Sequence, residues 1–167
     1  SQFYLQGGNL FEDVLFRDMR LTPMKVVAGA DNVFRRVRVR HCLSGFSTQS
    51  AAGTIWEDCD IDVRCLDDRG NLVPSGLWFR NRCLSIGHQD AGARITRGSM
   101  RGASWAIEAF EGNGPPTALV IDGTTIDAVH YGVSNNARQA VTRNVSISLG
   151  PLGYVGAEHN LTASFRD

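Results

Sequence analysis

The densest group of side chains that could do chemistry is the segment Asp58-Cys-Asp-Ile-Asp62. If Ile61 points inward on a β-strand, Asp60 and Asp62 point outward together, about 6.5–7 Å apart along the strand. That separation lies at the lower end of the range for inverting glycosidases, in which one acid protonates the leaving oxygen and the other activates water. The same pair could instead hold Ca²⁺ for a lyase. Asp60 and Asp62 are therefore the first candidate catalytic residues.

Arginines recur at equivalent positions of the neighbouring segments. Guanidinium groups bind carboxylates through two parallel hydrogen bonds, so arginines beside acids suit a polymer of acidic sugars. The alternative is structural, because Arg38 with Asp60 and Arg40 with Asp62 would lie on adjacent rungs and form cross-strand ion pairs that stabilise stacking modestly. The candidate substrate-binding residues of this group are Arg38, Arg40, Arg101 and Asp127.

A second group combines a histidine, a tyrosine and a tryptophan. His130 and Tyr131 are adjacent in the chain, and either could serve as the base that removes a sugar C5 proton in a lyase or epimerase. A lone histidine in a β-repeat is otherwise a structural residue. Trp105 and Tyr131 fall outside the main aromatic column of the repeat, so they are candidate exposed platforms on which sugar rings stack.

A degenerate repeat of about 21 residues places these side chains. Its units start at Leu15, Val33, Ile55, Trp78, Arg94, Val120 and Val141. The second position is aromatic in the first four units, with Phe16, Phe34, Trp56 and Phe79, and the seventh is apolar from Leu21 to Ile147. Residues that tolerate the left-handed conformation of a tight turn dominate the fourth position, which reads Asp18, Arg36, Asp58, Asn81, Arg97, Gly123 and Asn144.

Two apolar columns beside a turn column describe a strand, a bend and a second strand that are stacked coil upon coil. One coil cannot bury its own apolar face, so its neighbours must cover it. The sequence thus predicts an all-β fold, a right-handed single-stranded parallel β-helix of about seven coils. One domain would span residues 1–167, with the repeat over about 10–150, and its open ends suggest a fragment of a longer β-helix or ends covered by neighbours. A β-sandwich is the main competitor, but it would not repeat the same columns.

Composition excludes some functions. Lys and Arg number 17, as do Asp and Glu, so the net charge is zero and the basic excess typical of nucleic-acid binding is absent. No apolar run approaches the 18 or so residues of a membrane span, so membrane insertion is not expected. The spacing of the four cysteines matches no zinc template, and buried free thiols are expected instead. These cysteines are Cys42, Cys59, Cys65 and Cys83.

The Phe-Arg-Asn-type turn, the Ile/Val column and the phrase Gly92-Ala-Arg-Ile-Thr-Arg-Gly98 resemble the pectate-lyase-like superfamily over about residues 10–150. That superfamily includes pectin and alginate lyases, polygalacturonases, mannuronan epimerases and the β-helical tailspikes of bacteriophages. The Asn-Thr-Asp and Gly-His-Gly strings of polygalacturonases and the Asp-Pro-His string of alginate epimerases do not occur. The resemblance therefore implies an architecture more than an activity.

What the resemblance implies is a carbohydrate-binding protein, similar to phage tailspikes and depolymerases, that is extracellular or virion-associated. Its partner would be an acidic polysaccharide, and if it is an enzyme it would be a hydrolase or a lyase. Two alternatives remain. One is a non-catalytic shaft or adhesin segment that forms a homotrimer, and the other is a lyase or epimerase that uses His130 and Tyr131 with Ca²⁺. No cofactor is expected apart from Ca²⁺, which the enzymatic alternatives could use.

Overall fold

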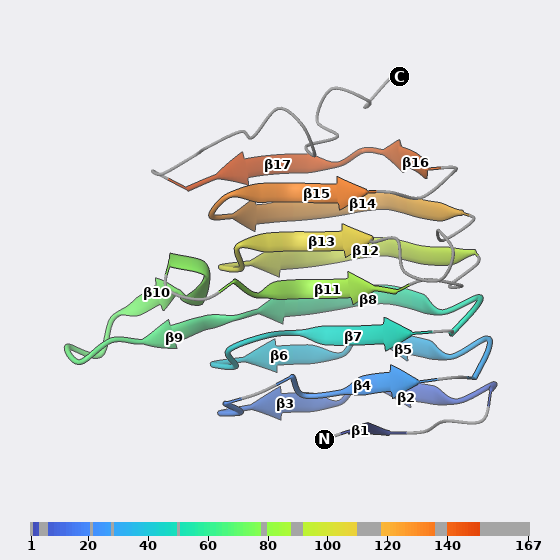
Figure 1. The fold of residues 1–167 in the computed structure, drawn as a ribbon, viewed down its shortest axis with the longest axis horizontal. Coiled ribbons are helices and arrows are strands. Elements are labelled where there is room, and N and C mark those ends of the chain that lie inside the picture. The colour runs from blue at the N-terminus through green and yellow to red at the C-terminus, as the bar shows by residue number, and fades with distance from the viewer. Residues whose placement is uncertain are drawn as a thin grey trace.

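The computed structural model describes residues 2–3, 7–20, 22–27, 29–49, 51–77, 80–87, 92–109, 118–135 and 140–150. Over these ranges the chain forms a parallel β-solenoid in which two sheets face each other (Figure 1). The six-stranded sheet, called sheet A below, is ordered β1 (Gln2–Phe3), β4 (Lys25–Val27), β7 (Phe46–Gln49), β11 (Arg82–Ile86), β13 (Trp105–Ala109) and β15 (Tyr131–Asn135).

The second sheet, sheet B, has nine strands because some of its rungs are split in two by a bend. Its split rungs are β2 (Leu10–Glu12) with β3 (Leu15–Arg17), β5 (Val33–Arg35) with β6 (Arg38–Arg40), and β16 (Ala140–Arg143) with β17 (Ser146–Leu149). Its continuous rungs are β8 (Ile55–Asp62), β12 (Ala93–Arg101) and β14 (Leu119–Ala128). In Figure 1 sheet A runs rightward in front and sheet B returns behind while the chain climbs, which makes the coil right-handed.

The solenoid has about five turns, fewer than the seven expected from the repeat. Five expected unit starts are confirmed, because Val33, Ile55, Arg94, Val120 and Val141 are successive Cα partners in sheet B. The start at Leu15 is wrong. Leu10 pairs with Val33, so the first rung begins five residues earlier than the alignment placed it.

The unit at 78–84 is also wrong, because β8 pairs directly with β12 and the described part of that unit begins strand β11 of sheet A. The coil between them is long because it carries a hairpin, β9 (Arg64–Leu66) and β10 (Leu72–Pro74), followed by a short 3-10 helix, η1 (Ser75–Leu77). Asn81, expected in the turn column, is instead buried, and its amide donates to the Leu43 carbonyl and to Ser75 Oγ. Leu21 and Phe79, expected in the apolar columns, lie outside the described residues.

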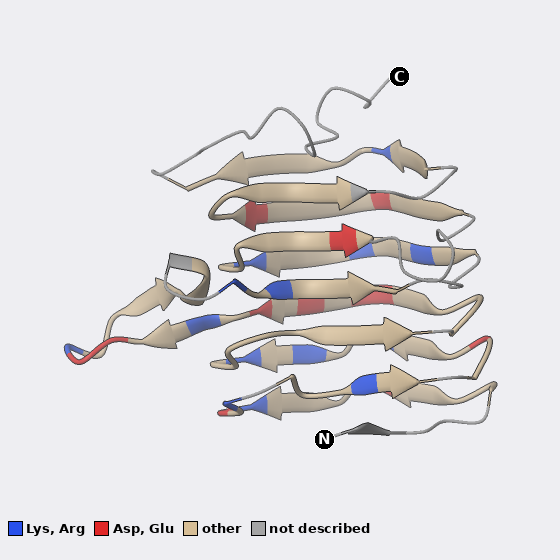
Figure 2. Cartoon of the chain, in the orientation of Figure 1, with Lys and Arg blue, Asp and Glu red and all other residues tan. Residues whose placement is uncertain are grey.

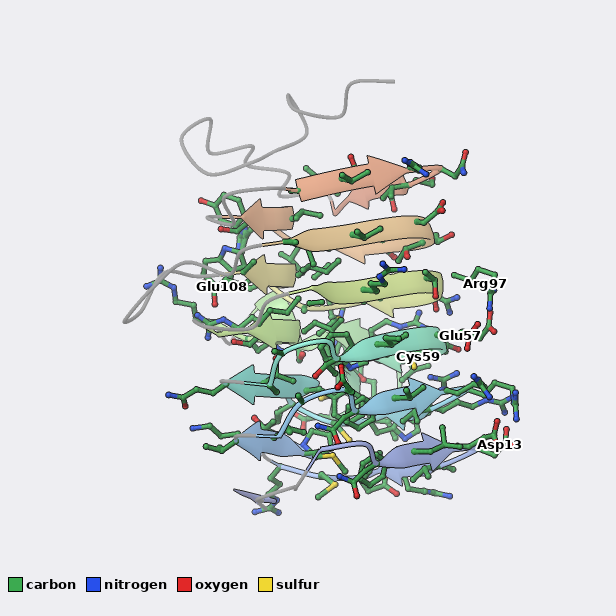
Figure 3. All side chains as sticks on the ribbon, turned by 90° about the vertical axis from the view of Figure 1, so that its right-hand side faces the viewer. Asp13, Glu57, Cys59, Arg97 and Glu108 are labelled. Carbon is green, nitrogen blue, oxygen red and sulfur yellow. The ribbon has the colours of Figure 1, made fainter. Side chains whose placement is uncertain are left out.

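The turn column is confirmed in six rungs, with Asp13 in place of Asp18 in the first. Its non-glycine members have φ between 50° and 55°, and Gly123 has φ 63°. Arginine is an unusual choice for this left-handed conformation. Here Arg36 forms two hydrogen bonds of 2.8 Å to Asp13, and Arg97 bonds Asp58 at 2.7 and 2.9 Å. Figure 3 shows this side of sheet B, from which Asp13, Glu57 and Arg97 project.

The core lies between the sheets and is built from inward columns. Phe11, Phe34 and Trp56 stack on successive rungs, with ring centroids 5.0 and 5.9 Å apart and nearly parallel planes. Three of the cysteines, Cys42, Cys59 and Cys83, are buried free thiols as expected, and Cys65 is half-buried. Among the described residues, no helix has the length and apolarity needed to cross a membrane.

Candidate functional site

The sequence-predicted residues fall into two groups on either side of one edge of the solenoid. The first group lies at the ends of the sheet B strands, and the second lies at the starts of the sheet A strands that follow. Arg101 ends β12 and Trp105 begins β13, so a turn of three residues separates the two groups. The β9–β10 hairpin projects from the same edge (Figure 1).

The first group, called the acid–arginine face below, consists of outward residues on four successive rungs. Figure 2 shows basic residues on β6 and β12 and acidic residues on β8 and β14. Arg38 is the Cα partner of Asp60, and Arg101 is the Cα partner of both Asp62 and Asp127. The repeat therefore aligned these columns correctly.

The Asp60 carboxylate forms an ion pair and a hydrogen bond, but with other residues than the sequence predicted. Its carboxylate bonds Arg40 diagonally across the rungs and accepts a hydrogen bond from the hydroxyl of Ser99. Arg40 also donates to the backbone carbonyl of Asp60 at 3.0 Å. The expected pair of Arg38 with Asp60 does not form, although the two residues are in register, because Arg40 occupies that carboxylate.

Asp62 is buried and is bound by Arg64, two residues along the chain. The Arg64 Nε lies 2.9 Å from Asp62 Oδ1, and the Arg64 backbone N–H donates to the same oxygen at 3.1 Å. Burial alone would raise the pKa of the Asp62 carboxyl, but the hydrogen bonds and charge of Arg64 outweigh burial and hold this pKa below its ordinary value. The expected Arg40–Asp62 ion pair is therefore replaced by Arg64–Asp62. A general acid needs a raised pKa, and Asp62 has the opposite.

Because the folded-state pKa of Asp62 is depressed, its contribution to stability should be present above the ordinary aspartate pKa and lost as the pH falls through the folded-state value. We expect Asp62→Asn to lower the free energy of unfolding by about 1–2 kcal/mol at neutral pH, since Arg64 keeps some access to water. Urea unfolding of both proteins checks this. The difference should shrink as the pH falls below the ordinary aspartate pKa, and a difference that does not depend on pH would contradict the ion-pair explanation.

Two arginines of this face have no ion pair with any described residue. Arg101 is half-buried between Asp62, whose carboxylate is already bound by Arg64, and the exposed Asp127, and it forms an ion pair with neither acid. Arg38 is exposed beside Asp60, whose carboxylate is already bound by Arg40 and Ser99. The acids thus leave two guanidinium groups able to bind an external anion.

The second group contains Trp105, which is not the exposed platform that the sequence suggested. Only 9% of Trp105 is exposed. The ring of Tyr131 stacks on it at 5.3 Å and 9°, while Arg80 and Arg82 approach with their Cζ atoms 4.9 and 5.4 Å from its centroid. Arg82 is held by an ion pair with Glu108, which Figure 3 shows on the side opposite the turn column. The Trp105 ring is therefore covered by cation–π contacts with the two arginines and is not free to stack on a sugar ring.

His130 and Tyr131 do lie together, on the rung that begins β15. Their ring centroids are 6.4 Å apart and tilted by 56°, and both backbone N–H groups donate to the Ser104 carbonyl. Both side chains are half-exposed. Tyr131 ends the aromatic stack, since β15 is the last described strand of sheet A, so its outer ring face is not covered by a further described strand.

The sequence interpretation missed Arg64, Arg80, Arg82 and Glu108. One signal was present, because Arg82 stood where the alignment of unit 78–84 required an apolar side chain. Arg80 stands inside the same mistaken unit, and Arg64 and Glu108 lie between the recognised units. In the part of the chain that the structure describes, no three His, Cys, Asp or Glu side chains are arranged to hold a metal ion.

Comparisons of the chain with models of protein families, with curated proteins and with solved structures find no match. The parallel β-solenoid that the resemblance implied is present. Membership of the pectate-lyase-like superfamily stays a prediction.

Proposed function

We propose that this β-helix binds an anionic polysaccharide along the acid–arginine face, and that Asp60 and Asp62 support this face rather than catalyse. The observation that carries the proposal is the pair of guanidinium groups, Arg38 and Arg101, which form no ion pair with any described residue. Arginine forks match carboxylates in geometry and charge. The two lie on rungs separated by β8, about 10 Å apart along the axis, so an extended polymer could contact both.

Binding without cleavage fits the condition of the two acids better than hydrolysis does. Asp62 stays ionised because its pKa is lowered, and both carboxylates already accept hydrogen bonds from protein groups. An inverting hydrolase requires one protonated acid and one carboxylate free to activate water. Uronate-rich polymers of bacterial surfaces or of plant and algal walls are the substrate class that such a face would accept.

The test is affinity electrophoresis or biolayer interferometry with alginate, polygalacturonate and hyaluronan, and with neutral dextran as the control polymer. We expect binding to the acidic polymers alone, weakening as salt rises. Arg38→Gln and Arg101→Gln should each lower affinity about fivefold, the effect of losing about 1 kcal/mol. Arg94→Gln is the matched control, because Arg94 lies on β12 like Arg101, is exposed like Arg38 and forms no ion pair with any described residue, but stands in another column.

Two results would contradict the proposal: equal binding to dextran, or affinity unaffected by both substitutions. Polymer cleavage should be followed in the same samples by ultraviolet absorbance of unsaturated uronates and by reducing ends. Cleavage that disappears in Asp60→Asn would move the assignment to an enzyme. Cleavage that disappears in Tyr131→Phe would move it to the lyase alternative.

A second candidate is a structural shaft, which one observation favours. The first outward column of sheet B is aliphatic on five of its six rungs and includes Leu10, 55% exposed, and Val141, 43% exposed. An exposed apolar column on a long flat sheet is the kind of surface that packs against identical chains. A closed trimer in sedimentation velocity, dispersed by Ile55→Lys, would support this function.

A further inference from the structure

The two ends of the solenoid carry incompletely buried core residues. Among the residues that the structure describes, the partly buried apolar side chains packed against the core belong to the first or last coil, and they are Phe11, Val14, Phe16, Met19, Val145, Ile147 and Leu149. In the middle coils the equivalent residues are covered from both sides. At the ends, β2–β3 and β16–β17 form the outer edges of sheet B among the described residues. Within the described ranges, each end therefore carries apolar side chains together with strand backbone that pairs on one side only.

We propose that these two ends dock on each other, so that copies of this chain stack head to tail into a longer rod. All neighbouring rungs of each sheet are parallel. Only the head-to-tail arrangement places β2–β3 of one copy parallel to β16–β17 of the next. An end-to-end contact of two identical ends would be antiparallel and would break the register of the columns.

Charge complementarity supports a second copy as the occupant. One outward column of sheet B begins with Glu12 on the first rung and ends with Arg143 on the last. The residues between them, each the Cα partner of the next, are Arg35, Glu57, Thr96 and Asp122. Within the chain Glu12 already accepts from Arg35 at 3.3 Å. Stacked copies would bring Arg143 of one beneath Glu12 of the next, which repeats that contact across the junction.

Backbone shape and apolar columns match as well. The turn column begins with Asp13, φ 55°, and ends with Asn144, φ 51°, so both edges bend at the same position and in the same way. Leu10 would cover Val141, and Phe16 would cover Ile147, each continuing its own column. A heterologous contact of this kind does not close on itself, so association should continue with concentration and produce rods.

Sedimentation velocity over a range of protein concentrations tests the proposal, with negative-stain electron microscopy for rods. We expect sedimentation coefficients that rise continuously with concentration. Arg143→Glu and Glu12→Arg should each weaken association about tenfold or more, because each places like charges across the junction. Arg94→Glu, at a mid-rod position on the same sheet, is the control and should leave association unchanged. Circular dichroism confirms that each variant is folded.

Mixing the two variants gives the decisive result. The glutamate introduced by R143E would meet the arginine introduced by E12R, and the native pair would form at the alternate junctions, so rods should reappear in the mixture. Three outcomes would overturn the proposal: a monomer at every concentration, association that ignores both substitutions, or a closed trimer. None of these outcomes bears on polysaccharide binding, which is measured on a different face.

Discussion

Alanine at position 98 is expected to lower the free energy of unfolding by about 3–5 kcal/mol. Gly98 follows the left-handed Arg97 and itself has φ 111°, a conformation that disfavours any side chain. It also lies in register with Cys59, and a Cβ atom at Gly98 would stand 2.2 Å from the Cys59 carbonyl oxygen. That oxygen belongs to the backbone of the adjacent rung and cannot move without breaking the pairing of β8 with β12.

Gly70→Ala is the matched control for this loss. Gly70 lies in the loop of the β9–β10 hairpin with φ 80°, and an added Cβ there would meet nothing within 4 Å. We expect about 1–2 kcal/mol for Gly70→Ala, which isolates the conformational cost from the steric one. Equilibrium unfolding in urea measures both variants. Equal losses would contradict a steric contribution from the close approach of β8 to β12.

Two substitutions of Trp56 should separate the contribution of its packing to stability from that of its indole N–H group. Trp56 is 1% exposed and stacks on Phe34, so Trp56→Ala is expected to cost about 3–5 kcal/mol through the cavity it leaves. The indole Nε1 is buried and has no hydrogen-bond partner among the residues that the structure describes. Removing such a donor recovers part of its desolvation cost, about 1–3 kcal/mol, so Trp56→Phe should lie within about 1 kcal/mol of the original protein.

Thermal or urea unfolding followed by far-ultraviolet circular dichroism distinguishes the two substitutions. Val141→Ala, in an exposed position of the terminal rung, is the control and should change stability by less than about 0.5 kcal/mol. A Trp56→Phe protein as unstable as Trp56→Ala would mean that the indole N–H does find a partner.

The sequence predicted sheet B well because its rungs repeat a physical constraint. Inward columns must be apolar and the bend must accept a left-handed residue, so Val33, Ile55, Arg94, Val120 and Val141 could be aligned without a structure. Sheet A was not recognised. Its strands are short and mix small polar residues with apolar ones, as in β7, Phe46–Gln49, which lies in a stretch interpreted as a separator.

For the candidate site, the sequence predicted which residues share a column but not which side chains bind each other. Register fixed that Asp62, Arg101 and Asp127 are neighbours on adjacent rungs. It could not fix which arginine each acid binds, because side chains of this length reach diagonally and along the strand as easily as across it. The repeat also carried no information on Arg64, which belongs to the insertion, and it misplaced Arg80 in the mistaken unit 78–84.

That insertion has a consequence for how this protein could change over evolutionary time. The β9–β10 hairpin is a separate two-stranded sheet, and its tip residues Leu66 and Leu72 are exposed. The chain leaves the coil after Asp62 and rejoins it at β11, while β8 and β12 stay paired as if nothing intervened. Lengthening or exchanging the hairpin would therefore leave the ladder of rungs intact, and its entropic cost would grow only slowly with loop length. The third coil is thus the point at which this scaffold can acquire a new module while the rest of the rod is inherited unchanged.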